Sequence, residues 1–456
     1  MVNGIRISHL EVENGTINLQ GRDSMAHTFS LHDLNLELDS LSLSREGWDY
    51  GSLELGASLE DLSWPLPDSI HHIRLGQLHF SSEEKSLIAE NLKLLPRGHD
   101  SIDFRARIDL PRIALRGFSL EDLIRSRRVQ LESIDLSEPD IRLVGKLETK
   151  APRKVNTSFF DGLYPVIKPW IKLISANQIG VQGARLVQVG LDNTMIQHID
   201  GLSIGLQGFE LDSIPQSQLM RARDIRLEAD EYEFRLNDDY ALKGKGLWLS
   251  TLSRFFQTDS LQLKPLNERA SYALTIPSLI IEGLNANAAW FDRDISVQKI
   301  HIAQPLITAR RPPQKEASQL ASLAEKDLYS FVSGALKRLK VDELEMEDGQ
   351  LSLRLADDPR AAPFTASKVA LWIKDFVLQP NRNNNRPFNA ADVRLSMDAD
   401  EYAFTLPDSS HQVLLHSLRI STADSAIIVD SLRFRPLMPG RHSSLTMLAP
   451  RCLFTA

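Results

Sequence analysis

Apolar and polar residues alternate along most of this chain in short runs of four to eight residues. Leu261-Gln262-Leu263, Ile225-Arg226-Leu227 and Tyr232-Glu233-Phe234 are typical of these runs. A period of two places every second side chain on the same face of a strand, so such runs indicate β-strands with one buried face. The alternation therefore predicts a mostly-β fold.

The strand pattern is written almost three times, with a period of about 168 residues. A Leu-x-Leu or Leu-x-Phe run precedes Pro96, Pro265 and Pro436, which lie 169 and 171 residues apart (265 − 96 and 436 − 265). Stacked modules reuse one supersecondary unit in this way, whereas a single core rarely does. Each of the three prolines is predicted to end a strand, because proline cannot donate a hydrogen bond to a ladder.

The repeat divides the chain into three predicted modules. They are residues 1–150, which lack the opening helix; 151–315, complete with a helix and about a dozen strands; and 316–456, truncated at the C-terminal end. A hairpin-like segment is predicted near the start of each module, at residues 10–19, 179–186 and 344–351. Because the chain starts and stops out of phase with its own repeat, we expect it to be a piece of a longer protein.

Two amphipathic helices are predicted, at residues 157–174 and 318–339. Their apolar residues recur at helical spacing, and Ser318 can cap the second helix. Pro165 and Pro169 are expected to kink or interrupt the first. One interpretation is that each helix covers the open end of the preceding sheet. The other is a lipid-contacting helix, since apolar bulk beside Lys168 also suits a membrane surface.

Composition narrows the classes of function. The chain has a net charge of −8, with 7% aromatic residues and no basic patch, which argues against nucleic-acid binding. The single cysteine excludes an internal disulfide and a cysteine metal cage. The chain has no secretory signal at its start and no run of about 18 apolar residues of the kind that spans a bilayer.

Candidate catalytic chemistry is sparse in the sequence. No nucleophile elbow, zinc-binding helix motif, P-loop or dinucleotide fingerprint occurs. The acidic pairs Asp230-Glu231 and Asp400-Glu401 recur at one phase of the repeat, where turn residues or edge protection are the simpler interpretation. His71 and His72, adjacent on a presumptive strand, project to opposite faces and cannot share a metal. We therefore predict a non-enzymatic protein with no cofactor and no metal.

The repeated strand registers resemble those of a known family. Strings such as Asp259-Ser260-Leu261-Gln262-Leu263-Lys264-Pro265 and Ile134-Asp135-Leu136-Ser137-Glu138-Pro139 are similar to the AsmA-like family of bacterial envelope proteins. That family is similar in architecture to TamB and to chorein-type bridge-like lipid-transfer proteins. The resemblance implies an elongated, repeating, curled β-sheet (a β-groove, solenoid-like) with one short amphipathic helix opening each module.

The resemblance also implies a location and partners. Members are held at the inner membrane by an N-terminal helix, with the sheet on the periplasmic side of the cell envelope. The implied ligand is a phospholipid or another acyl-chain lipid, and envelope proteins are possible partners in outer-membrane biogenesis. This sequence lacks the anchor, so membrane attachment would rest on a segment that it does not contain.

A lipid-carrying groove needs a lining of apolar side chains on one face. The positions predicted to supply it share i, i+2 spacing at repeated phase. They are Leu92, Leu94, Phe234, Leu236, Leu247, Leu249, Leu261, Leu263, Phe404, Leu406, Leu432 and Phe434. The alternative prediction is a structural or adhesive β-solenoid whose core is packed by its own side chains. The two hypotheses differ in whether these apolar side chains meet one another or face open space.

Overall fold

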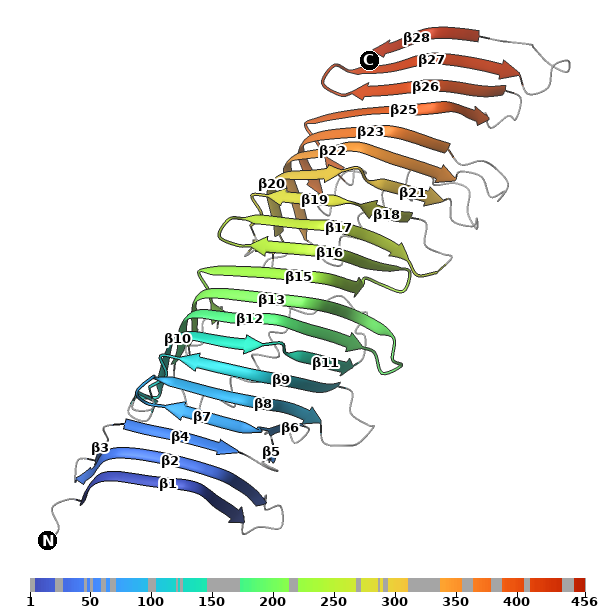
Figure 1. Ribbon diagram of the computed structural model, residues 1–456. Helices are drawn as coiled ribbons and strands as arrows, with labels where there is room; N and C mark the ends of the chain where they lie inside the picture. Colours follow the sequence, from blue (N-terminus) through green and yellow to red (C-terminus); the bar gives the residue numbers. More distant parts are fainter. Residues whose placement is uncertain are drawn as a thin grey trace. The chain divides into compact units, whose positions relative to one another are not determined.

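The computed structural model describes a large part of the chain, and each element with described bounds is a β-strand (Figure 1). The described residues are 5–20, 28–44, 47–49, 52–58, 63–65, 71–96, 104–119, 122–123, 126–145, 173–212, 220–267, 272–285, 288–289, 294–310, 337–354, 364–378, 388–405, 411–436 and 447–455. The chain divides into two compact units, Met1–Tyr232 and Glu233–Ala456. The mostly-β prediction is confirmed.

Unit 1 is one sheet whose strands follow the order of the chain. Its strands are β1 (Ile5–Gln20), β2 (Thr28–Ser44), β3 (Gly47–Asp49), β4 (Ser52–Ser58), β5 (Ser63–Pro65), β6 (His71–Arg74), β7 (Gln77–Ser81), β8 (Ser86–Pro96), β9 (Phe104–Arg116), β10 (Arg128–Ser137), β11 (Asp140–Gly145), β12 (Leu173–Val189), β13 (Met195–Asp212), β14 (Met220–Arg221) and β15 (Asp224–Arg235), whose last three residues belong to unit 2. Hydrogen-bonded neighbours run β1, β2, β4, β7, β8, β9, then β10 with β11, then β12, β13 and β15.

Unit 2 is built in the same way. Its strands are β16 (Tyr240–Ser250), β17 (Phe255–Pro265), β18 (Tyr272–Ile276), β19 (Ser278–Glu282), β20 (Asp294–Ala303), β21 (Leu306–Arg310), β22 (Arg338–Arg354), β23 (Phe364–Leu378), β24 (Phe388–Asn389), β25 (Asp392–Thr405), β26 (His411–Ser421), β27 (Ala426–Pro436) and β28 (Met447–Thr455). Neighbours run β16, β17, β18 with β19, β20 with β21, β22, β23, β25, β26, β27 and β28.

Among the strand pairings whose register is described, one parallel junction interrupts the antiparallel order in each unit. β10 and β11 pair in parallel with β12, and β20 and β21 pair in parallel with β22. A parallel pair needs a crossover of a dozen or more residues. The chain provides 27 residues at each place (173 − 145 − 1 and 338 − 310 − 1). The repeat thus sets the position of the parallel junction as well as that of the strands.

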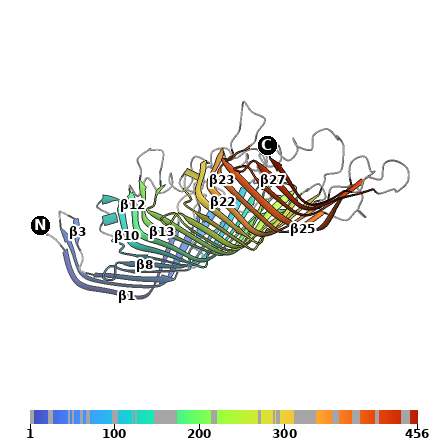
Figure 2. The ribbon, with the colours of Figure 1, turned by 90° about the horizontal axis from the view of Figure 1, so that it is seen from above.

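Repeated β-bulges bend the long strands. Register shifts fall between Val12 and Gly15, between Val181 and Ala184, and between Met346 and Gly349. The residue with positive φ inside each bulge is Asn14, Gly183 or Asp348. A bulge places two residues opposite one and bends the strand. Figure 2 shows the bent course of the long strands, which agrees with a curled sheet.

The same bulges correct part of the prediction from sequence. The three segments predicted as hairpins, at residues 10–19, 179–186 and 344–351, lie inside the single strands β1, β12 and β22. Residues 151–315 contain ten described strands, close to the predicted dozen, but several lie end to end and fill only seven places across the sheet. A bulge shifts the alternation by one residue, which imitates a turn in the sequence.

The predicted helices at 157–174 and 318–339 fall mostly outside the described residues. Their last residues were predicted wrongly, because Leu173 and Ile174 open β12 while Arg338 and Leu339 open β22. Both pairs of residues gain ladder partners, Leu173 across from Arg128 and Leu339 across from Ile295. At these positions the conformation is therefore determined by backbone pairing in a long parallel ladder and not by the helical spacing of apolar residues.

The predicted strand ends are confirmed. β8, β17 and β27 are each 11 residues long and end at Pro96, Pro265 and Pro436. Leu92, Leu261 and Leu432 are each the seventh residue of these strands. The sequence repeat is therefore a repeat of strand register.

Candidate functional site: the apolar face of the sheet

A continuous row of large apolar residues crosses unit 1. Directly paired residues on neighbouring strands project to the same face. The row runs through nine adjacent strands as Val12, Leu36, Leu55, Phe80, Leu87, Leu115, Ile134, Ile179 and Leu206. Phe80 is buried, whereas the other eight are half-buried. One face of this sheet is therefore apolar and incompletely covered.

Unit 2 has a matching row over ten adjacent strands. It contains Leu247, Thr258, Leu279, Ile302, Met346, Leu371, Leu395, Ile420, Ile427 and Phe454. Thr258 is the one polar member, and its hydroxyl donates to the carbonyl oxygen of Lys245 at 2.8 Å. The last two members are the least covered: Ile427 is 41% and Phe454 55% exposed, whereas Thr258, Leu279 and Met346 are buried.

The apolar face lies on the inside of the bend. In unit 2, Met346, Ala366 and Val369 form a buried cluster at the bulge of β22 and β23. Ile302 and Ile307, from either side of the Gln304–Pro305 corner, both pack against this cluster. Side chains from the two arms of a bent sheet can meet only on the concave side. The apolar rows are thus the lining of a curved surface.

The opposite face carries charge. In unit 2 the directly paired residues Glu282, Lys299, Glu343, Lys374 and Asp392 alternate in sign over five strands. In unit 1, Lys93 lies 3.7 Å from Asp109, and Arg185 lies 3.4 Å from Asp200. Alternating cross-strand charges stabilise a solvated face. The sheet therefore has one apolar side and one charged side.

Most of the predicted lining residues have half-buried side chains within described strands. The nine that are half-buried within their strands are Leu92, Leu94, Phe234, Leu247, Leu249, Leu261, Leu263, Leu432 and Phe434. Leu94 pairs with Ile73 and Ile108, and Leu263 pairs with Leu242 and Leu274, so apolar neighbours surround both. Phe434 pairs with Val413 and Met447.

The other three predicted positions differ. Leu236 was placed wrongly on the strand: it follows β15 in a turn, is 44% exposed, and its amide donates to the carbonyl oxygen of Tyr240 at 2.9 Å. Phe404 lies in β25 across from Val413, and its side chain is outside the described part. Leu406 lies outside the described residues.

The recurring acidic pair is part of a strand and not of a turn, which corrects the prediction. Asp230 and Glu231 lie within β15. The Asp230 carboxylate occupies the space above Gly201 (φ +64°), where a Cβ would lie 2.0 Å from Oδ2. Asp259 lies over Gly246 (φ +62°) in the same way. These carboxylates cover gaps left by glycine in the neighbouring strand, which is a structural role.

Parallel pairing gathers a polar group that the sequence did not reveal. The Nζ of Lys299 on β20 lies 2.7 Å from the Oε2 of Glu345 on β22, and His301 lies 3.0 Å from Glu347. The hydrogen bond from Lys299 lowers the pKa of Glu345, and the same bond raises the pKa of Lys299. His301, Glu345 and Glu347 could present ligand atoms within 4.8 Å of one another, as could His9, Glu37 and Asp39. At the first group the Lys299 ammonium already binds Glu345.

The sequence separation explains why this group was missed. Lys299 and Glu345 are 46 residues apart and meet only through the β20–β22 register. His71 and His72, singled out from sequence, are instead both buried on β6, where His71 Nε2 accepts from the amide of Ala106 at 3.0 Å.

In the described part of the chain, no helix is long and apolar enough to cross a bilayer.

Comparison with protein-family models, with curated proteins and with solved structures finds no significant match for this chain. The resemblance to the AsmA-like family thus stays a prediction from strand registers. What can be argued about function comes from the two-sided sheet itself.

Proposed function

We propose that the concave apolar face binds the acyl chains of lipid, and that the protein is a non-enzymatic lipid-binding or lipid-conducting segment of the bacterial envelope. One observation carries the proposal: each unit has a row of large apolar side chains in register over nine or ten strands, most of them half-buried. A sheet with one apolar face covers it by closing, by adding a layer, or by binding something apolar.

The alternative is a structural or adhesive solenoid with a self-packed core. Such a core buries Leu, Ile and Phe side chains against one another. Within the described ranges, the largest side chains below 2% exposure are Val297, Val341, Thr258, Asp224, Pro305 and Ser81. The leucines of the apolar rows do not reach that level of burial. This distribution favours an open lining over a filled core.

Acyl chains suit this lining energetically. Each buried methylene contributes about 0.8 kcal/mol, so ten methylenes contribute roughly 8 kcal/mol before the costs of binding. Apolar burial is non-directional, so a lining of Leu, Ile and Val needs no specific contact to hold a chain. The location on the periplasmic side of the inner membrane, the lipid partner and the envelope-protein partners follow from the family resemblance and are part of the proposal.

Leu263→Asp tests the proposal against the solenoid. Leu263 is half-buried between Leu242 and Leu274, two residues before the end of β17. A carboxylate facing acyl chains costs several kcal/mol, whereas on an open face it reaches water when the lipid is absent. We expect the variant to lose co-purified lipid in native mass spectrometry while its Tm falls by only a few degrees.

Gln262→Asp is the matched control. Gln262 is the exposed neighbour of Leu263 and projects to the other face of the same strand. The control should keep both lipid and Tm. Wild-type protein without lipid, or Leu263→Asp with undiminished lipid, would contradict the proposal. Outright unfolding by Leu263→Asp would instead support the self-packed solenoid.

A further inference from the structure

A cavity of about 570 Å³ lies on the charged face of unit 2, within the size range of small-molecule sites. Four small residues on neighbouring strands leave the space: Ala370, Ser396, Ser421 and Ala426. The rest of the lining comes from Trp372, Arg394, Arg419, Ile428, Asp424, Glu345 and Glu347, and from four members of the apolar row on the same strands, Met346, Leu371, Leu395 and Ile420. The cavity is formed by the far side of the same strands whose concave face is apolar.

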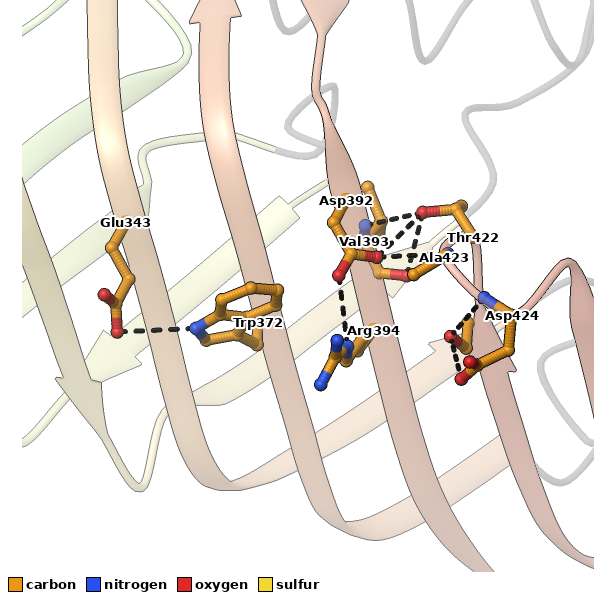
Figure 3. A network of polar contacts seen from close by, with 9 residues as sticks. Glu343, Trp372, Asp392, Val393, Arg394, Thr422, Ala423 and Asp424 are labelled. Atoms are coloured by element: carbon orange, nitrogen blue, oxygen red, sulfur yellow. Dashed lines mark hydrogen bonds and ion pairs between the residues drawn. The ribbon is translucent and has the colours of Figure 1, made fainter.

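Two guanidinium groups meet diagonally at this cavity. Arg394 pairs with Ser421, and Arg419 pairs with Ser396, so the two arginines share one face of β25 and β26. Arg394 lies over the Trp372 ring, with its Cζ 4.9 Å from the ring centroid, and its Nε donates to Asp392 at 3.1 Å. Figure 3 shows Trp372 and Arg394 side by side on adjacent strands. Stacking and the Nε bond fix the guanidinium plane.

Arg394 and Arg419 have more N–H donors than the protein provides acceptors for. Among the described residues, no bond engages the Nη groups of Arg394, and Arg419 is exposed without a hydrogen bond or ion pair. The nearby carboxylates already have donors. Glu345 accepts from Lys299 at 2.7 Å, Glu347 from His301 at 3.0 Å, and Asp424 from the Ser421 hydroxyl at 2.7 Å. The N–H donors that remain free at the cavity therefore belong to the guanidinium groups of Arg394 and Arg419.

The repeat does not require these residues. By the register of the preceding module, Gly205 takes the place of Trp372, Gly180 that of Glu345, and Trp248 that of Arg419. The Asp392–Arg394 pair, by contrast, recurs as Asp224–Arg226, also with 3.1 Å between Nε and Oδ2. The fold therefore needs the Asp-x-Arg pair but not the tryptophan or the second arginine.

We propose that this cavity, here called the Trp372 cavity, binds a phosphate-bearing ligand between Arg394 and Arg419. A planar guanidinium recognises phosphate through two parallel N–H bonds, and two guanidiniums can divide its oxygens between them. The hydroxyl of Ser396 supplies a further donor. The phosphate could belong to a free small molecule or to a lipid headgroup presented from outside. This binding is independent of acyl chains on the opposite face.

The test uses glycerol 3-phosphate and vesicles containing phosphatidylglycerol as separate probes. Binding is measured by calorimetry for the first and by co-sedimentation for the second, with the wild-type chain and with Arg419→Gln. We expect the variant to weaken binding about tenfold. Retained binding in Leu263→Asp would show that a failure of the acyl-chain proposal leaves this one standing.

Arg433→Gln is the control, since Arg433 is exposed on β27 outside the cavity. Selective loss in Arg419→Gln with glycerol 3-phosphate supports a site for a free phosphate compound. Selective loss with vesicles alone supports a headgroup site. Equal loss in both arginine variants, or no phosphate-dependent binding by wild type to either probe, overturns the proposal.

Discussion

Charged residues on the charged face pair with residues of a neighbouring strand that are far away in the sequence. The Lys299–Glu345 bond joins β20 to β22, and Glu343 lies 3.6 Å from the same ammonium. The Lys299 side chain is 37% exposed and that of Glu345 is 32% exposed. Ion pairs this exposed are worth at most about 1 kcal/mol. They specify register more than they stabilise the sheet.

Lys299→Met should therefore reduce stability by less than about 1 kcal/mol at pH 7. The pKa of Glu345 is lowered in the folded state, so its contribution is present above the ordinary pKa near 4.5 and is lost as pH falls through the folded pKa. The pKa of Lys299 is raised, so its contribution persists below about 10.5. The difference between wild type and variant in urea unfolding should thus disappear in acid. A difference undiminished at pH 3 would show that lost packing, not charge, causes it.

A repeated backbone conformation controls the bends. Asn14, Gly183 and Asp348 occupy one bulge position and have φ of 51°, 65° and 51°. Glycine, asparagine and aspartate are the residues that tolerate the left-handed region best. The sequence repeat preserves this conformation while the side chain varies.

Gly183 gives a direct test of that rule. A Cβ at this position would meet Glu138 Cγ at 3.5 Å, an ordinary contact, so backbone strain dominates the effect of substitution. Gly183→Val should cost roughly 1–2 kcal/mol or more, whereas Gly183→Asn should cost much less because Asn14 fills the equivalent place. Chemical denaturation of both variants measures this. Equal losses would mean that the bulge conformation is not repeated in solution.

The sequence predicted where strands lie better than it predicted how long each strand is. Alternation located the strands, and the prolines located the ends of β8, β17 and β27. The alternation could not distinguish a bulge from a turn. Gln182-Gly183 has the composition of a hairpin loop, although Gly183 continues β12. Contacts made by parallel pairing, such as Lys299 with Glu345, were also not predicted, since nothing local to either residue specifies the partner strand.

For the molecule as a whole, the decisive feature is that each unit has an apolar and a charged side. Neighbouring residues on one strand therefore sample opposite environments. Leu395 lies in the apolar row of unit 2, and Ser396, the next residue of β25, projects to the other face. Leu371 and Ala370 on β23 form a second such pair. A probe placed at either member of such a pair therefore samples one face or the other from the same strand.

Photo-crosslinking at these pairs tests the central claim most directly. A benzophenone amino acid is placed singly at Leu371, Leu395, Ala370 or Ser396, and the illuminated protein is analysed by mass spectrometry for attached acyl chains. Acyl-chain binding on the concave face predicts adducts at Leu371 and Leu395, with few at Ala370 and Ser396. Adducts of equal yield on both faces, or none at either leucine in protein that retains lipid, would contradict the account.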